Sequence, residues 1–254
     1  MSDDKHIRAE RERIAFDTTD VWENTRRLHR RFSHVFESPN TLRGEHALQA
    51  WLTAKCRDAT VLEYGCADGG NAIMYRRLGA KRVIGVDISE VSIAEAREKY
   101  GDLAEFHCCD AESLAMLDDS SVDAIFGRAI LHHLHFEASV SEVFRLLRPG
   151  GSAFFVEPLY DNPASMVFRK LTPKARTADE RPLSRAQLLY ADRLFSSSLH
   201  CYCNLVTTPV GMLTSMLPLQ PDNLALRAAD WADRKLAATP LRHWMRIAYL
   251  CWVK

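Results

Sequence analysis

The chain lacks an excess of charge of either sign, because 33 lysine and arginine residues are balanced by 33 aspartate and glutamate residues among its 254. A balanced chain produces no long-range field that would attract nucleic acid or an anionic membrane surface. It also lacks a run of about 18 apolar residues, the length that a membrane-spanning helix needs. Residues 1–16, MSDDKHIRAERERIAF, are charged where a signal peptide would be apolar. These absences predict a cytoplasmic protein without stable membrane insertion or a nucleic-acid partner, which acts on a small molecule.

Paired cysteines are lacking as well. The seven cysteines are an odd number, and no two of them have Cys-x-x-Cys spacing, so the sequence predicts neither a disulfide framework nor a zinc site. We therefore expect no metal, and thiols that are reduced and mainly structural. The residues are Cys56, Cys66, Cys108, Cys109, Cys201, Cys203 and Cys251.

Short apolar runs alternate with amphipathic segments between residues 60 and 158. Strands that alternate with helices predict right-handed crossovers and a parallel sheet covered on both faces. Pro149, Gly150 and Gly151 are expected to turn the chain from the fourth crossover helix into the fifth strand. The tail HWMRIAYLCWVK has the composition of a last, antiparallel strand. The predicted fold is α/β, a Rossmann-like, doubly wound, mostly parallel seven-stranded sheet with helical cap or lid additions.

The predicted domains are an amino-terminal helical cap or lid, residues 1–50, and a main domain, residues 51–254, with substrate-cap or interface insertions at 159–194 and 207–243. Trp22 and Phe32 are candidates for the lid, with a core position as the alternative. Residues 195–220 contain no Asp, Glu, Lys or Arg and predict a buried strand followed by a loop. Met212, Leu213, Met216 and Leu217 in that loop would line a lipophilic pocket or a homodimer interface. Arg169, Lys170, Lys174 and Arg176 would either receive an acidic substrate or form a solvated surface.

Residues 61–70, VLEYGCADGG, combine an apolar strand end with small residues before a helix that begins near Asn71. Gly65, Ala67 and Gly69 let the backbone turn tightly and let a ligand approach the main chain. The pattern also fits a relaxed dinucleotide fingerprint or a tight turn without a ligand. Glu63 separates these readings, because a carboxylate repels a diphosphate and attracts the ammonium and sulfonium groups of S-adenosylmethionine.

VLEYGCADGG resembles the first motif of class I S-adenosylmethionine-dependent methyltransferases, although Ala67 replaces the middle glycine of the family pattern. RVIGVDIS, AEFHCCDAESL, SVDAIFGRAILHHL and VFRLLRPGGSAFFVEP resemble later motifs in the family's order. The group most similar is the small-molecule, quinone-biosynthesis and natural-product group, methyltransferase type 11-like. The resemblance covers about residues 60–158 and implies S-adenosylmethionine as cofactor and S-adenosylhomocysteine as product. The cofactor residues that it implies are Glu63, Gly65, Cys66, Ala67, Gly69, Asp87, Ile88, Asp110, Ala111 and Arg128.

Asp87 would accept both ribose hydroxyls, and Asp110 would accept from the adenine amino group beside the amide of Ala111. Each acid also fits an ordinary cap or turn. Arg128 would contact the cofactor's carboxylate or pair with a surface acid.

His132, His133 and Glu157 are the candidate catalytic residues. An oxygen or carbon acceptor needs a base, and the resemblance favours His132 for that role, with Glu157 orienting its ring. An amine acceptor would need mainly positioning, and a structural histidine pair is a further alternative. Two other classes stay open: a nicotinamide-dependent oxidoreductase and a noncatalytic cofactor-binding module.

Overall fold

The computed structural model describes residues 2–18, 21–162, 166 and 180–254. Arg169, Lys170, Lys174, Arg176 and the side chain of Trp22 lie outside the described part.

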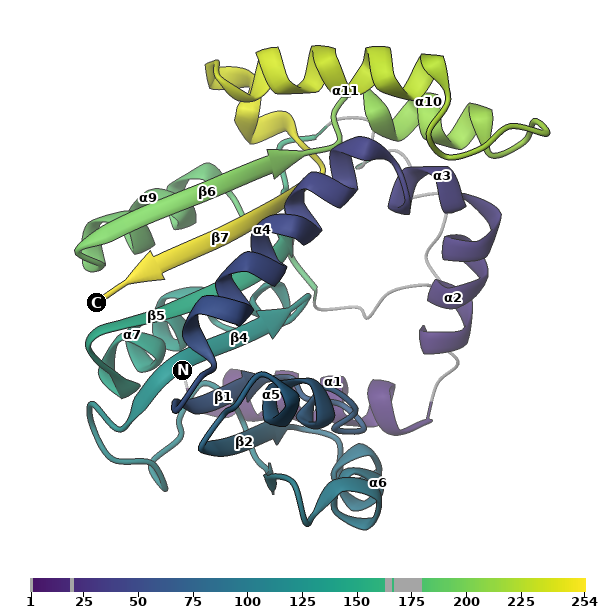
Figure 1. The fold of residues 1–254 in the computed structure, drawn as a ribbon. Helices are drawn as coiled ribbons and strands as arrows, with labels where there is room; N and C mark the ends of the chain where they lie inside the picture. Colours follow the sequence, from purple (N-terminus) through teal and green to yellow (C-terminus); the bar gives the residue numbers. More distant parts are fainter. Residues whose placement is uncertain (1, 19–20, 163–165, 167–179) are drawn as a thin grey trace.

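Seven strands form one sheet in the order β3-β2-β1-β4-β5-β7-β6. The neighbours from β3 to β5 are parallel, whereas β7 runs antiparallel to both β5 and β6. The predicted mostly parallel sheet with a last antiparallel strand is therefore confirmed (Figure 1). The strands are β1 (Thr60–Tyr64), β2 (Arg82–Asp87), β3 (Glu105–Cys108), β4 (Val122–Arg128), β5 (Leu147–Pro158), β6 (Ser197–Cys203) and β7 (Ile247–Val253).

The central strands are apolar on both faces because helices cover both faces. All five residues of β1 are buried. One face packs against side chains of α4 (Pro39–Lys55), α5 (Ala72–Arg77) and α6 (Glu90–Tyr100). The other packs against α7 (Phe136–Leu146) and α9 (Arg185–Leu194). This two-sided cover is the doubly wound arrangement that the alternating pattern predicts.

The structure adds detail at two predicted boundaries. Helix α4 continues through residue 50, and its Trp51 and Leu52 are buried against the sheet. After α7 the chain enters β5 at Leu147, and the pairing with β4 then jumps to Ser152. Pro149–Gly151 thus form the turn inside the irregular start of β5.

The remaining helices are α1 (Ser2–Thr18), α2 (Val21–Arg31), α3 (Ser33–Phe36), η1 (Leu131–His133), α10 (Thr207–Thr214), α11 (Leu224–Ala237) and η3 (Pro240–Trp244). Helices α2 and α3 lie beyond the end of the sheet toward which the arrow of β4 points (Figure 1). Among the described helices, none is both long and apolar enough to cross a membrane.

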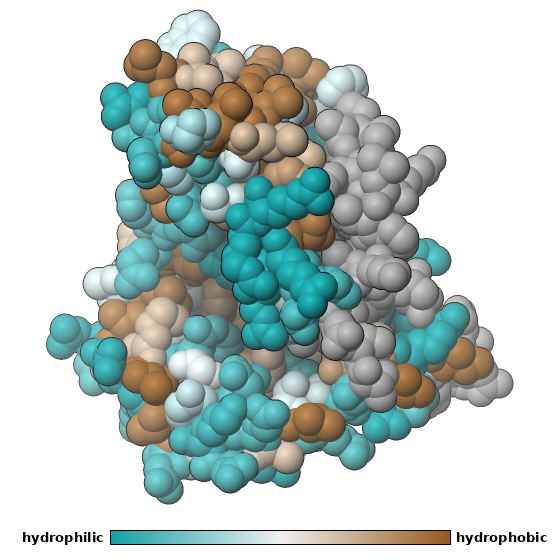
Figure 2. Space-filling model, turned by 90° about the vertical axis from the view of Figure 1, so that its right-hand side faces the viewer, coloured by the Kyte–Doolittle hydropathy of each residue, from teal (hydrophilic) through white to brown (hydrophobic). Residues whose placement is uncertain are grey.

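The uncharged segment 195–220 differs from its prediction. β6 is an edge strand, and its first three residues are exposed, so it is not a buried strand. The expected loop contains α10, and Leu213, Met216 and Leu217 are 66%, 71% and 54% exposed. Figure 2 shows an apolar surface at the top of this face, where Figure 1 places the turn between α10 and α11. These three side chains therefore do not line an internal pocket.

Candidate active site

The loop after β1 needs small residues because of its backbone. Gly65, Ala67 and Gly69 have φ angles of 69°, 46° and 74°, in the left-handed region where side chains are strained. A Cβ on Gly69 would also lie 2.7 Å from the Phe106 ring. The positive φ angle of Ala67 explains why the family pattern that this segment resembles has glycine at the same place.

Asp87 holds this loop to the end of β2. Its Oδ2 accepts a hydrogen bond from the amide of Ala67 at 2.9 Å, and its Oδ1 accepts one from the amide of Ser89 at 2.9 Å. Burial raises the pKa of Asp87, and the amide hydrogen bonds offset part of that rise. A carboxylate has about four acceptor positions, so Asp87 keeps the capacity to accept from a ligand.

Glu63 lies beneath the loop and is 4% exposed. Its Oε1 accepts a hydrogen bond from Asn71 Nδ2 at 2.6 Å. Burial raises the pKa of Glu63 to about 8, so the carboxyl group is mostly protonated at neutral pH. A cation that approaches the loop would favour the ionised form, which couples ligand binding to proton release.

A pocket lies at the carboxyl ends of β1, β2 and β4, with an empty volume of about 790 Å³ that includes space open to solvent. Parallel strands bring their carboxyl ends to one edge, which is where open α/β sheets bind ligands. The predicted residues that line it are Gly65, Ala67, Asp87, Ile88, Asp110, Ala111, Arg128 and His133. The described lining does not include the other predicted residues, Glu63, Cys66, Gly69, His132 and Glu157.

Some lining residues were missed by the sequence reasoning. Ser92, Cys109, Glu112, Ala129, Ile130 and Leu134 follow the predicted strands closely, so a wider window after each strand would have included most of them. Arg8, Ala9, Glu12 and Phe16 come from α1, and no local motif marks them.

Helix α1 is fixed across this pocket by polar contacts. Arg8 pairs with Glu112 at 3.1 Å and donates to the backbone oxygen of His133. Glu12 lies 3.1 Å from His133 Nδ1. Helix α1 therefore forms part of the pocket wall, and His133 is one of its attachment points.

His132 and Glu157 form a buried pair behind the pocket wall. His132 Nδ1 lies 2.7 Å from Glu157 Oε2, and the two residues are 7% and 0% exposed. Glu157 Oε1 accepts from the amides of Ile130 and Leu131 at 3.0 and 2.9 Å. The ionised carboxylate thus places the imidazole proton on Nδ1 and leaves Nε2 as an acceptor. Burial and the neighbouring His133 lower the pKa of His132, which keeps the ring neutral at pH 7.

Arg128 lies at the end of β4 and makes two hydrogen bonds to Glu45, at 2.8 and 2.9 Å. Glu45 also accepts from the hydroxyl of Tyr249 at 2.8 Å. Arg128 therefore has the acid partner that was one of its two predicted contacts, and it lines the pocket as well.

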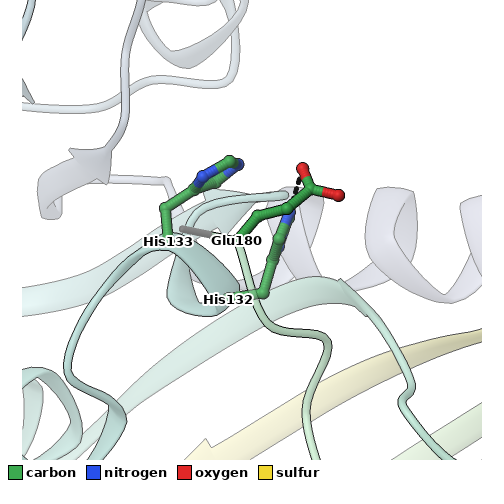
Figure 3. Close-up of side chains that lie close together, drawn as sticks. All are labelled: His132, His133 and Glu180. Carbon is green, nitrogen blue, oxygen red and sulfur yellow. Dashed lines mark ion pairs between the residues drawn. The ribbon is translucent and has the colours of Figure 1, made fainter. Parts of the chain in front are cut away.

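A cation could also be held here. His132, His133 and Glu180 each offer a ligand atom within 4.8 Å of the other two. Figure 3 shows Glu180 over the His132 ring, with a carboxylate oxygen 3.9 Å from Nε2. Imidazole nitrogens and a carboxylate are a suitable donor set for a divalent transition metal.

Residues 62–155 match the family model described as a methyltransferase domain. The chain is 38% identical over 108 residues to a probable S-adenosylmethionine-dependent methyltransferase of Mycolicibacterium smegmatis, covering 39% of this chain and 38% of that protein. It is 30% identical over 115 residues to the demethylmenaquinone methyltransferase of Chlorobaculum parvum, covering 45% and 46%. The chain thus spans less than half the length of these two relatives.

Two solved structures share the fold at low sequence identity. Geranyl diphosphate C-methyltransferase from Streptomyces coelicolor A3(2) has a TM-score of 0.54 at 16% identity, covering 82% of this chain and 78% of that one. The [4+2]-cyclase SpnF has a TM-score of 0.53 at 20% identity, covering 82% and 80%. At such identities the likeness establishes the architecture alone.

Proposed function

Because residues 62–155 are a class I S-adenosylmethionine-dependent methyltransferase domain, we propose that the protein transfers a methyl group from S-adenosylmethionine to an oxygen or carbon atom of a small, lipophilic metabolite. The product of the cofactor would be S-adenosylhomocysteine. The proposal rests on one observation: the glycine-rich loop after β1, Asp87 and Asp110 line the same pocket.

In this proposal the pocket lining and Glu63 beneath the loop supply one group for each part of the cofactor. Asp87 accepts from the ribose hydroxyls with the capacity that its two amide bonds leave. Asp110 and the amide of Ala111 bind the adenine edge from the end of β3. Glu63 ionises beneath the loop when the cationic methionine part binds above it.

His132 acts as the general base in this proposal. Its pairing with Glu157 fixes the tautomer, and its lowered pKa keeps Nε2 available to accept a proton from the acceptor. Positive charge leaves sulfur during the transfer, so alignment of the acceptor supplies the rest of the catalysis. An amine acceptor, which is nucleophilic without a base, would depend on alignment alone.

An apolar acceptor is favoured by the similarity to a demethylmenaquinone methyltransferase and, in fold, to a geranyl diphosphate C-methyltransferase, since both of these substrates carry hydrocarbon chains. Leu213, Met216 and Leu217 are exposed, so they do not line the acceptor site. We propose that they form the interface of a homodimer, which light scattering at increasing concentration would test; a Leu217→Glu variant should then be monomeric.

The first experiment is calorimetric titration of S-adenosylmethionine, S-adenosylhomocysteine and NADH into the wild type, Asp87→Ala and Asp102→Ala. Asp102 is an exposed acid away from the pocket lining, so its variant is a matched control. We expect micromolar binding of the first two ligands, loss in Asp87→Ala and no change in Asp102→Ala. Binding of NADH alone would establish the oxidoreductase alternative instead.

Cofactor binding alone does not establish transfer, because the fold also occurs in the [4+2]-cyclase SpnF. The second experiment therefore supplies S-adenosylmethionine with a labelled methyl group and an organic extract of cells. We expect label in an extract component, and loss of that label in His132→Ala with unchanged affinity for S-adenosylhomocysteine. Absence of labelled product with intact cofactor binding would favour a noncatalytic module.

A further inference from the structure

Arg246 lies at the carboxyl edge of the sheet, just before β7. Its backbone oxygen accepts from the amide of Leu159 at 3.0 Å, which continues the pairing of β5 with β7 past Pro158. Its amide donates to the oxygen of Asn204 at 3.3 Å. The residue is thus anchored by its backbone two positions before the residue that pairs with Glu157.

The guanidinium of Arg246 presents two shielded donor nitrogens. Its Nε and one terminal nitrogen are shielded from solvent and have no hydrogen-bond partner among the described residues. The guanidinium carbon lies 5.2 Å from the centre of the Phe36 ring on α3, which supplies a cation–π contact. Tyr249 and Cys203 lie near it, but the pKa of each is raised, so both are neutral at pH 7 and neither supplies an anion.

In the ligand-free protein this arrangement lowers the stability of the folded state. A buried cation without a counter-ion loses its hydration, and among the described residues the aromatic ring of Phe36 is the group that offsets that loss. Burial lowers the pKa of Arg246 to about 10, so the group is still a cation at neutral pH. Buried unsatisfied donors of this kind call for a specific explanation.

Arg128 lies at the same edge of the sheet and, unlike Arg246, has a described acid partner. Glu45 balances the charge of Arg128. Glu45 also accepts a hydrogen bond from Tyr249, which lies close to Arg246 in space. Arg128 lines the cofactor pocket, whereas Arg246 is not among the lining residues.

We propose that Arg246 binds an anionic group, a carboxylate or a phosphate, on the methyl acceptor. This inference rests on the proposed function and narrows the acceptor to a lipophilic anion. An anion with two oxygens matches the two donor nitrogens that lack partners, and Phe36 lies beside it for an apolar part of the same molecule.

The test uses three probes with one hydrocarbon chain: octanoate, octyl phosphate and octanol. Each is titrated into the wild type, Arg246→Met and Arg242→Met, with and without saturating S-adenosylhomocysteine. Arg242 is exposed and lies four positions away, so its variant controls for the loss of one positive charge. We expect an anionic probe to bind the wild type and Arg242→Met at least about tenfold more tightly than octanol, as a charged hydrogen bond in a shielded site requires.

In Arg246→Met the anion is expected to bind no more tightly than octanol, with unchanged affinity for S-adenosylhomocysteine. The stronger of octanoate and octyl phosphate identifies the anionic group. Equal binding of all three probes by the wild type, or an anion preference that persists in Arg246→Met, would overturn the inference. So would a loss of S-adenosylhomocysteine affinity alone, since it would assign Arg246 to the cofactor.

The melting temperature distinguishes an anion-binding role of Arg246 from a structural role. Arg246→Met should raise the melting temperature of the ligand-free protein, because it removes an uncompensated buried charge. A lower melting temperature with unchanged probe binding would make Arg246 structural. Failure of the wild type to bind S-adenosylhomocysteine would overturn the proposed function, while the titrations without that ligand would still decide the role of Arg246.

Discussion

Replacement of Glu63 by glutamine is expected to stabilise the protein at neutral pH. Glu63 is 4% exposed, and its pKa rises from an ordinary value of 4.5 to about 8 in the folded protein. Between these two values the folded state keeps a proton that the unfolded state releases, so the wild type loses stability as the pH rises. Glutamine carries no charge in either state and removes this loss, and its side-chain oxygen can still accept from Asn71.

The size of the effect follows from the two pKa values of Glu63. The wild type loses about 1.4 kcal/mol per pH unit between pH 4.5 and pH 8. The free energy of unfolding of Glu63→Gln should therefore exceed that of the wild type by about 3 kcal/mol at pH 7 and about 4 kcal/mol at pH 8, with little difference near pH 4.5.

Urea unfolding at several pH values measures this difference directly. Glu105→Gln is the control, because Glu105 lies on the exposed side of β3 in an ion pair with Arg82, where a charge change has little effect on stability. Parallel stability profiles for Glu63→Gln and the wild type from pH 5 to pH 8 would refute the reasoning. Calorimetry in buffers of different ionisation enthalpy should also detect proton release when S-adenosylmethionine binds the wild type, and none in Glu63→Gln.

Four further predictions concern the loop after β1, helix α1 and the proposed base. Ala67→Gly should raise the free energy of unfolding by about 0.5–1 kcal/mol, because φ at Ala67 is 46°; destabilisation in urea would contradict this. Arg8→Met should make opening of α1 about tenfold more frequent by hydrogen exchange, since a charged hydrogen bond is lost, and unchanged protection would show that Arg8 does not hold the helix. Glu157→Gln should lower turnover by about 10- to 100-fold without changing the affinity for S-adenosylhomocysteine. If turnover and that affinity fell by the same factor, the role of Glu157 would be structural. Because the pKa of His132 is lowered, turnover of the wild type should fall on acidification only below pH 6.5, and a fall that begins at higher pH would contradict a neutral base.

Much of the fold followed from local patterns. Five apolar runs separated by amphipathic segments predicted β1 to β5, and the apolar tail predicted β7. Parallel strands end at one edge, so the sequence alone predicts that Gly65, Asp87 and Asp110 share one pocket, and all three line it. The small residues at 65, 67 and 69 predicted a tight loop, and their positive φ angles are the backbone reason.

The sequence by itself determined the sheet, its carboxyl edge and the loop on that edge, because periodicity, strand ends and backbone strain act over a few residues. Only the tertiary structure decided what covers and completes the site. Arg8 meets Glu112 and Arg246 meets Phe36 across more than a hundred residues of chain, and such contacts leave no spacing in the sequence. The same holds for charge. Burial keeps Glu63 protonated, and in the described part of the chain packing leaves two donor nitrogens of Arg246 without a partner; both are properties of packing and not of residue order.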